Sequence, residues 1–172
     1  MAALDEAVRV SQNCCGRKCL DISAILADPE LFSQAREDMY QMYEREVFDI
    51  VVTTKLSGTV FASYLASRLN KGLVMVTCLE PRDGFLTEDI EGRNHALTVG
   101  IPEGLVKKDT RAVIIVDEVT HGRDIKAAID LVERQGGRVI KISAFVEDSE
   151  ENARKKVFRG YPIESRLFTE DF

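Results

Sequence analysis

The fold of this 172-residue chain is decided by Ala112-Val113-Ile114-Ile115-Val116-Asp117-Glu118-Val119-Thr120-His121-Gly122-Arg123-Asp124. The first five residues are small or β-branched and apolar, which is typical of a strand buried on both faces. Two acids follow, then a short loop around Gly122, and from Asp124 onward the apolar residues recur with the period of a helix. In a parallel sheet, ligands bind beyond the carboxyl ends of the strands, where loops meet helix N-termini. Paired carboxylates and a glycine loop at that place predict a phosphorylated ligand bound together with a metal ion.

The regions on either side of this stretch repeat the alternation of strand and helix. Upstream, buried strands are predicted at Phe48–Thr54 and Leu73–Cys78, with a helix between them that follows Lys55-Leu56-Ser57-Gly58. Downstream, Gly136-Gly137 ends the helix, and a further strand is predicted over Arg138–Val146. Such alternation predicts an α/β fold of the doubly wound kind, with a mainly parallel sheet, right-handed crossovers and helices on both faces.

Further elements are predicted near the two ends of the chain. Asp28-Pro29-Glu30 offers a capping side chain, a proline at the first helical position and an acid in the first turn, so a helix should run from there to about Arg45. The stretch Asp21–Leu26 is compatible with a short strand or with a helical turn. A short helix is expected over Glu151–Val157 and a strand over Ile163–Phe168.

Two regions lack a sustained period. Residues 1–20 form a weakly patterned lead-in with a turn at Gly16. The segment Leu79–Thr110 is rich in glycine and proline, and short strands around Phe85-Leu86 and Ala96–Val99 would form a hairpin within it. A long segment of this kind in a compact domain is usually functional or mobile. We therefore expect one domain, 1–172, in which residues 79–110 form a flap that covers a ligand.

Composition, charge and the absence of certain motifs argue against several classes of protein. The net charge of −6 argues against a nucleic-acid-binding surface. No apolar run approaches the roughly 18 residues that a membrane span needs, and no signal peptide is recognisable, so a cytoplasmic location without a membrane partner is expected. Neither a Walker A sequence nor G-x-G-x-x-G occurs, so neither a P-loop ATPase nor a Rossmann dehydrogenase is supported. The spacing of Cys14, Cys15 and Cys19 matches no common zinc pattern, so reduced thiols are expected there.

The stretch Val113–Asp124 resembles the hallmark of the type I phosphoribosyltransferases, and most of all that of the adenine and xanthine enzymes. Cys15–Ile22 and Ala27–Phe32 resemble the segment that adenine enzymes use near the base, and Lys55–Gly58 resembles the loop that meets pyrophosphate. This resemblance implies a Mg²⁺-dependent transfer of the phosphoribosyl group of phosphoribosyl pyrophosphate to a purine-type base, as in nucleotide salvage. It also implies a homodimer.

The resemblance implies three groups of site residues. The acids that hold the ribose hydroxyls, or Mg²⁺ through water, would be Asp117 and Glu118. The residues around the 5′-phosphate would be Thr120, His121, Gly122, Arg123 and Asp124. Those that meet pyrophosphate would be Lys55, Ser57 and Gly58. An ungapped alignment pairs Val116 and Asp117 with the two acids of the family, whereas a one-residue gap pairs Asp117 and Glu118 with them.

Three departures from the family pattern leave a second function open. Thr77 and Cys78 stand where relatives commonly have two basic residues that help to hold pyrophosphate. Cys19-Leu20 replaces the Phe-Arg found near the base in adenine enzymes. Asp124 replaces the last hydroxyl residue of the phosphate loop, and it is expected to be the N-cap of the following helix. The alternative to an enzyme is a regulatory protein that binds a nucleotide or phosphoribosyl compound without turnover.

Overall fold

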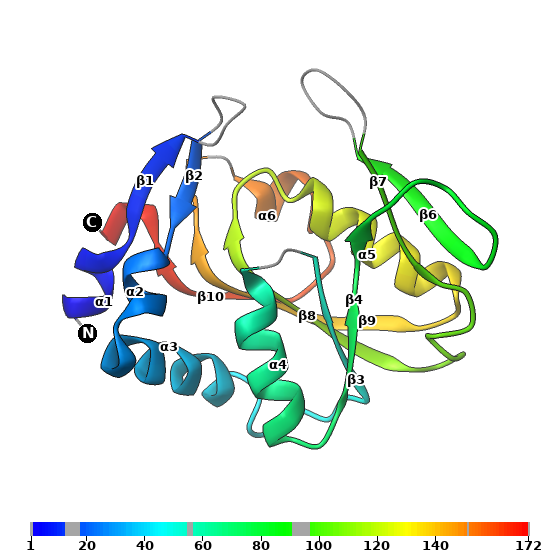
Figure 1. Ribbon diagram of the computed structural model, residues 1–172, viewed down its shortest axis with the longest axis horizontal. Helices are drawn as coiled ribbons and strands as arrows, with labels where there is room; N and C mark the ends of the chain where they lie inside the picture. The colour runs from blue at the N-terminus through cyan, green and yellow to red at the C-terminus, as the bar shows by residue number, and fades with distance from the viewer. Residues whose placement is uncertain (1, 13–17, 55–56, 91–96, 151, 172) are drawn as a thin grey trace.

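The computed structural model describes residues 2–12, 18–54, 57–90, 97–150 and 152–171 (Figure 1). Its centre is a five-stranded sheet in which all four neighbouring pairs are parallel. In spatial order the strands are β10 (Ile163–Phe168), β9 (Arg138–Glu147), β8 (Arg111–Val119), β3 (Ile50–Thr53) and β4 (Gly72–Met75). The predicted α/β fold with a mainly parallel sheet is therefore confirmed.

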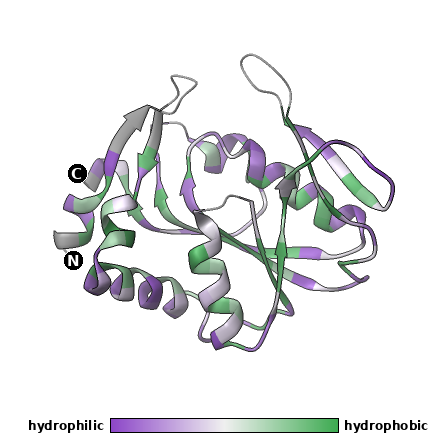
Figure 2. Ribbon diagram, viewed as in Figure 1, coloured by the Kyte–Doolittle hydropathy of each residue, from purple (hydrophilic) through white to green (hydrophobic). Residues whose placement is uncertain are grey.

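Each face of this sheet has its own apolar core. Val113 and Ile115 of β8 are fully buried in one cluster with α3 (Pro29–Gln41) and α4 (Gly58–Arg68). The alternate residues Ile114 and Val116 are fully buried in a second cluster with α5 (Arg123–Arg134). Because successive side chains of a strand point to opposite faces, an unbroken apolar run requires cover on both sides. Helices on both faces make the sheet doubly wound. The edge strand β4 is also mainly hydrophobic, as its green colour shows (Figure 2).

The helix α3 begins as its sequence predicts. The Asp28 side chain accepts hydrogen bonds from the backbone amides of Glu30 and Leu31, both at 2.9 Å, and Pro29 occupies the first helical position. The predicted end near Arg45 is wrong, because the helix stops at Gln41. The chain turns there so that the ring of Tyr43 is buried edge-on against that of Phe48, with 5.7 Å between ring centroids.

Two small antiparallel sheets flank the carboxyl edge of the central sheet (Figure 1). One contains β5 (Thr77–Cys78), β7 (Leu97–Pro102) and β6 (Phe85–Ile90), which confirms the predicted hairpin within the flap segment. The single strand predicted over Leu73–Cys78 is wrong, since Val76 separates β4 from β5 and the two halves pair in different sheets.

The other small sheet is an N-terminal hairpin of β1 (Arg9–Gln12) and β2 (Lys18–Asp21), which the sequence did not predict. The turn expected at Gly16 lies outside the described residues. The elements that complete this end of the chain are α1 (Ala2–Ala7) and α2 (Ser23–Ala27). Of the two alternatives for Asp21–Leu26, the structure thus has the helical one over most of the stretch. The elements that complete the other end are α6 (Ala153–Lys156) and a short 3₁₀ turn over Thr169–Asp171.

The strand β8 is longer than predicted. Instead of ending at Val116, it continues through both acids to Val119, because Glu118 pairs with Val146 and Val119 pairs with Glu147 of β9. The two acids are therefore part of the sheet and not of the loop beyond it. Within the part of the chain that the structure describes, no helix is long and apolar enough to cross a bilayer.

Candidate active site

The start of α4 lies directly against the acids of β8. A Cβ atom added to Gly58 would stand 3.1 Å from the Cα of Val116 and 3.2 Å from the backbone nitrogen of Asp117. Real Cβ atoms seldom come that close to backbone, so a glycine at this position favours the close approach of the helix start to β8. The structure thus brings the predicted pyrophosphate loop to the first predicted acid. Ser57 precedes Gly58 at the cap position, whereas Lys55 lies outside the described residues.

The two acids of β8 have different surroundings. Asp117 is 5% exposed and Glu118 is 9% exposed, so both carboxylates are largely buried. Because they are neighbours in a regular strand, their side chains leave it on opposite faces. Oε2 of Glu118 accepts a hydrogen bond from the backbone N–H of Leu20 in β2, at 2.7 Å. At least one oxygen of Glu118 is therefore engaged by the protein itself.

The loop between β8 and α5 requires a glycine for two reasons. Gly122 has a left-handed backbone with φ of 71°, a conformation that residues with a side chain rarely adopt. An added Cβ would also stand 2.5 Å from Cζ of Phe158. The neighbours Thr120 and His121 are half-buried, and Arg123, the first residue of α5, is exposed. The first turn of α5 therefore begins within residues 120–124, for which the sequence predicted phosphate binding.

The prediction that Asp124 caps α5 is wrong. Gly122 occupies the cap position, and no side chain accepts a capping hydrogen bond there. Asp124 lies instead in the first helical turn, where the helix dipole stabilises a negative charge. Its Oδ2 accepts a hydrogen bond from the Thr54 hydroxyl, at 3.0 Å, because Thr54 directly follows β3 at the same edge of the sheet. This contact joins the two predicted phosphate loops.

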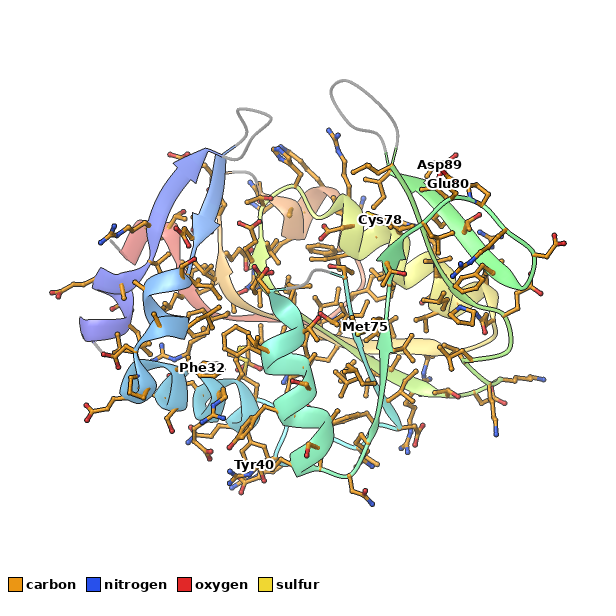
Figure 3. All side chains as sticks on the ribbon, viewed as in Figure 1. Phe32, Tyr40, Met75, Cys78, Glu80 and Asp89 are labelled. Carbon is orange, nitrogen blue, oxygen red and sulfur yellow. The ribbon has the colours of Figure 1, made fainter. Side chains whose placement is uncertain are left out.

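A cavity of about 340 Å³ opens at the ends of β3 and β4. It is lined by Thr53, Thr54, Thr59, Met75, Val76, Thr77 and Cys78. Figure 3 shows Met75 and Cys78 at the successive ends of β4 and β5. The two residues that replace the family's basic pair thus lie in this cavity. Thr53 is 1% exposed, and its hydroxyl has no hydrogen-bond partner within the described structure.

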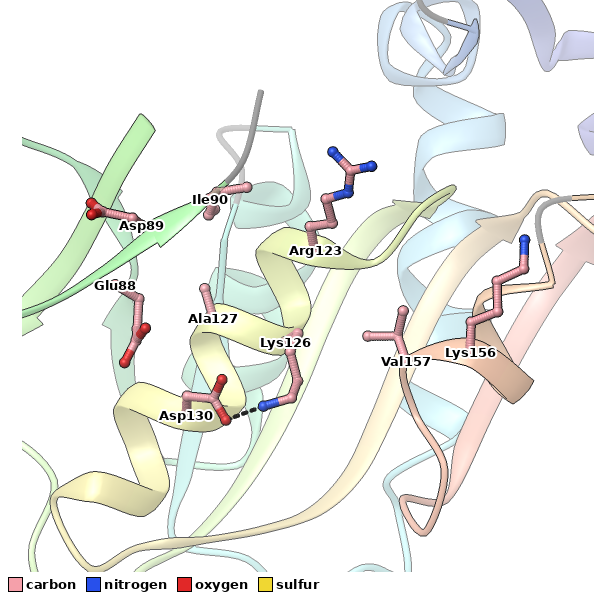
Figure 4. Close-up of a pocket in the computed structure, with 9 residues that line it drawn as sticks. All are labelled: Glu88, Asp89, Ile90, Arg123, Lys126, Ala127, Asp130, Lys156 and Val157. Carbon is pink, nitrogen blue, oxygen red and sulfur yellow. Dashed lines mark hydrogen bonds and ion pairs between the residues drawn. The ribbon is translucent and has the colours of Figure 1, made fainter. Parts of the chain in front are cut away.

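A second cavity, of about 390 Å³, lies between β6, α5 and α6 (Figure 4). Arg123 lines it together with Lys126 and Lys156, opposite Glu88 and Asp89 of the flap. The sequence singled out Arg123 but not the two lysines. Lys126 follows Arg123 by three positions on a helix, and that spacing was the signal that could have identified it.

The described residues contain no group of three or more His, Cys, Asp or Glu side chains that could hold a metal ion. The side chains of Cys14, Cys15 and Cys19 fall outside the described part, so their state stays a prediction.

The fold defines the class of protein, an α/β protein with a mainly parallel sheet, and the described residues predicted to bind phosphate and pyrophosphate lie at the carboxyl ends of β3 and β8. A family profile described as "Phosphoribosyl transferase domain" matches residues 21–170. The chain is 32% identical to the adenine phosphoribosyltransferase of Acetivibrio thermocellus over 87% of this chain and 88% of that one. It is 30% identical to that of Desulfosudis oleivorans over 80% of each.

Solved structures agree with these matches. The crystal structure of adenine phosphoribosyltransferase from Thermoanaerobacter pseudethanolicus superimposes with a TM-score of 0.88 at 28% identity, covering 97% of this chain and 98% of that one. The enzyme from Rhodothermus marinus gives a TM-score of 0.86 at 25% identity, covering 97% of each chain. The chain therefore belongs to the phosphoribosyl transferase family, as its sequence predicted.

Proposed function

We propose that this chain transfers the phosphoribosyl group of phosphoribosyl pyrophosphate to a purine-type base and releases pyrophosphate. The observation that carries this proposal is the family match over residues 21–170, which includes the whole β8–α5 element and its acids. The names of the relatives make adenine the first base to test.

Transfer of this kind needs little covalent chemistry from the protein. It needs charge stabilisation of an oxocarbenium-like centre and of the leaving pyrophosphate, in a site closed to water. We assign the ribose hydroxyls to the carboxylate of Asp117, a residue near the carboxyl end of β8 whose backbone nitrogen lies beside the start of α4. The 5′-phosphate would be held by backbone amides of residues 120–124 at the start of α5, with Arg123 as a cation.

The leaving pyrophosphate is assigned to the start of α4, near Lys55, Ser57 and Gly58. Thr53 lines the adjoining cavity, and its buried hydroxyl oxygen lies beside Gly58 at the start of α4. Hydroxyl and backbone donors at the start of α4 would replace the basic pair that relatives have where Thr77 and Cys78 stand here.

Mg²⁺ fits this arrangement as a partner of the substrate. The ion usually keeps several waters and is bound by one or two carboxylates together with substrate phosphates, so it needs no complete protein cage. Asp117 would hold it through water, and the ion would neutralise pyrophosphate charge. Removal of Mg²⁺ with a chelator should abolish transfer, and added Mg²⁺ should restore it.

A panel assay tests the function. Phosphoribosyl pyrophosphate is incubated with adenine, xanthine, hypoxanthine, guanine and uracil, and pyrophosphate release is followed. Release with a purine and not with uracil is the expected result. Calorimetric binding of phosphoribosyl pyrophosphate without release with any base would instead identify the regulatory alternative. No binding and no release would refute both.

The assembly and location are further parts of the proposal. We propose that the chain forms a homodimer, as the resemblance implies, and that it is located in the cytoplasm. Sedimentation equilibrium tests the first, and cell fractionation tests the second.

A further inference from the structure

The contact between Glu118 and Leu20 joins parts of the chain that are 98 positions apart. It links Glu118 near the carboxyl end of β8, next to Asp117, with β2 of the N-terminal hairpin. Both ends of the contact are shielded from water, since Leu20 is 5% exposed and Glu118 is 9% exposed. A charged acceptor at 2.7 Å in such a place makes a strong hydrogen bond.

The N-terminal hairpin needs an anchor of this kind. A two-stranded hairpin is marginally stable by itself in water, and its outer edges leave N–H groups without partners. Residues in an antiparallel pair alternately direct their N–H groups toward the partner strand and away from it. Leu20, paired with Val10, donates to Glu118, so its N–H is one that points away from β1. Glu118 therefore provides the acceptor that the edge of β2 would otherwise lack.

Apolar contacts hold the hairpin region against the same core. Leu4, Val8, Leu20 and Ile22 are all at most 6% exposed and belong to the cluster that contains Val113 and Ile115 of β8. Apolar burial is not directional, whereas one hydrogen bond to a fixed strand position defines the register of the hairpin relative to the acids.

We propose that Glu118 is a positioning residue, which fixes the N-terminal hairpin beside the site through the Leu20 amide, and not a ligand of ribose or metal. This inference rests on the proposed function for its kinetic consequences. The resemblance places Cys15–Ile22 near the base, so loss of the anchor should weaken binding of the base more than binding of phosphoribosyl pyrophosphate. Of the two acids, only Asp117 then remains for the ribose.

Two variants distinguish positioning from ligand binding. Glu118→Gln removes the charge but keeps an oxygen that accepts from the Leu20 N–H. Glu118→Ala removes the acceptor. If Glu118 positions the hairpin, Glu118→Gln should retain KM for the base within about threefold, and Glu118→Ala should raise it roughly tenfold or more, as expected for a lost hydrogen bond to a charged group. The dissociation constant of phosphoribosyl pyrophosphate should change little in either.

Amide exchange at Leu20, measured by NMR in the ligand-free protein, tests the anchor without any turnover. Exchange should be about tenfold faster or more in Glu118→Ala than in the wild type, and nearly normal in Glu118→Gln. Glu147→Gln is the matched control, because Glu147 is also a buried glutamate at a strand end but is paired with Arg154. It should leave exchange at Leu20 unchanged.

The outcomes separate the inference from the proposed function. If Glu118→Gln weakens binding of phosphoribosyl pyrophosphate as much as Glu118→Ala does, the carboxylate charge itself contacts the ligand and the inference fails. It also fails if exchange at Leu20 is the same in all variants. If the wild type releases no pyrophosphate with any base, the proposed function fails, while the exchange result still decides whether Glu118 anchors the hairpin.

Discussion

Neutralising Asp124 should tighten the binding of phosphoribosyl compounds. The carboxylate lies in the first turn of α5, close along the chain to the loop amides that would hold the phosphate in the proposed function. Two like unit charges about 4 Å apart repel by about 4 kcal/mol at an effective dielectric constant near 20. Arg123 offsets part of this repulsion, so we expect Asp124→Asn to lower the dissociation constant of ribose 5-phosphate roughly tenfold or more.

The asparagine variant preserves the local structure as far as possible. Its side-chain oxygen can still accept from the Thr54 hydroxyl, which now lies 3.0 Å from Oδ2 of Asp124. The loss of a negative charge in the first helical turn should cost only about 0.3–1 kcal/mol of unfolding free energy.

Isothermal titration calorimetry with ribose 5-phosphate at low and high salt measures the effect. The gain should shrink at high salt, since screening weakens a repulsion between partly exposed charges. Asp130→Asn controls for net charge, because Asp130 lies further along α5 and pairs with Lys126. Unchanged or weaker binding in Asp124→Asn would show that the carboxylate does not face the phosphate, or that it makes a contact the ligand needs.

Three other perturbations test the structure. Gly122→Ala should destabilise the protein by about 1–3 kcal/mol or more in urea unfolding, whereas Gly104→Ala, with a similar φ but open space around it, should cost less. Hydrogen bonds from Arg111 hold the pKa of Asp49 well below its ordinary value of 3.8, so Asp49→Asn should be less stable than the wild type at pH 7. That difference should shrink progressively as the pH falls below about 4 and disappear only below the lowered pKa of the folded protein, because the stabilisation is lost as the carboxylate becomes protonated. Amide exchange in residues 79–110 should slow when phosphoribosyl pyrophosphate binds, and equal exchange with and without ligand would exclude a closing flap.

The elements that the sequence predicted well are those with a strong local signal. The change from an apolar run to a helical period at Asp124 located β8 and α5, and the residues Asp28 and Pro29 located the start of α3. Such signals depend on neighbouring residues alone, and the physical rules for them are short-range.

The length of β8 illustrates what local patterns miss. Asp117 and Glu118 are poor strand residues by propensity, so an end at Val116 was the natural prediction. In the structure, the ladder with β9 continues past both acids to Val119, since Val146 and Glu147 stand in register with Glu118 and Val119. Pairing with a strand elsewhere in the chain outweighs local preference.

The N-terminal hairpin was missed for a related reason. A hairpin is usually recognised by alternating apolar and polar residues around a short turn, and residues 1–20 show no such alternation. What holds β2 in place is burial of Leu20 and Ile22 against the core and the bond to Glu118. Each of these interactions depends on residues that only the folded chain brings together.

The three acids near the carboxyl end of β8 have similar side chains but different contacts. Asp124 accepts from Thr54 and Glu118 accepts from Leu20, so two of the three carboxylates bind donors from distant parts of the chain. A carboxylate engaged in this way holds two segments together whether or not ligand is bound. The backbone nitrogen of Asp117 lies against Gly58 at the start of α4, and Asp117 is 5% exposed. The residue types alone predicted three acidic site residues. The contacts of Glu118 and Asp124 show that two of these carboxylates hold segments of the chain together, and the proposed function assigns the substrate to Asp117.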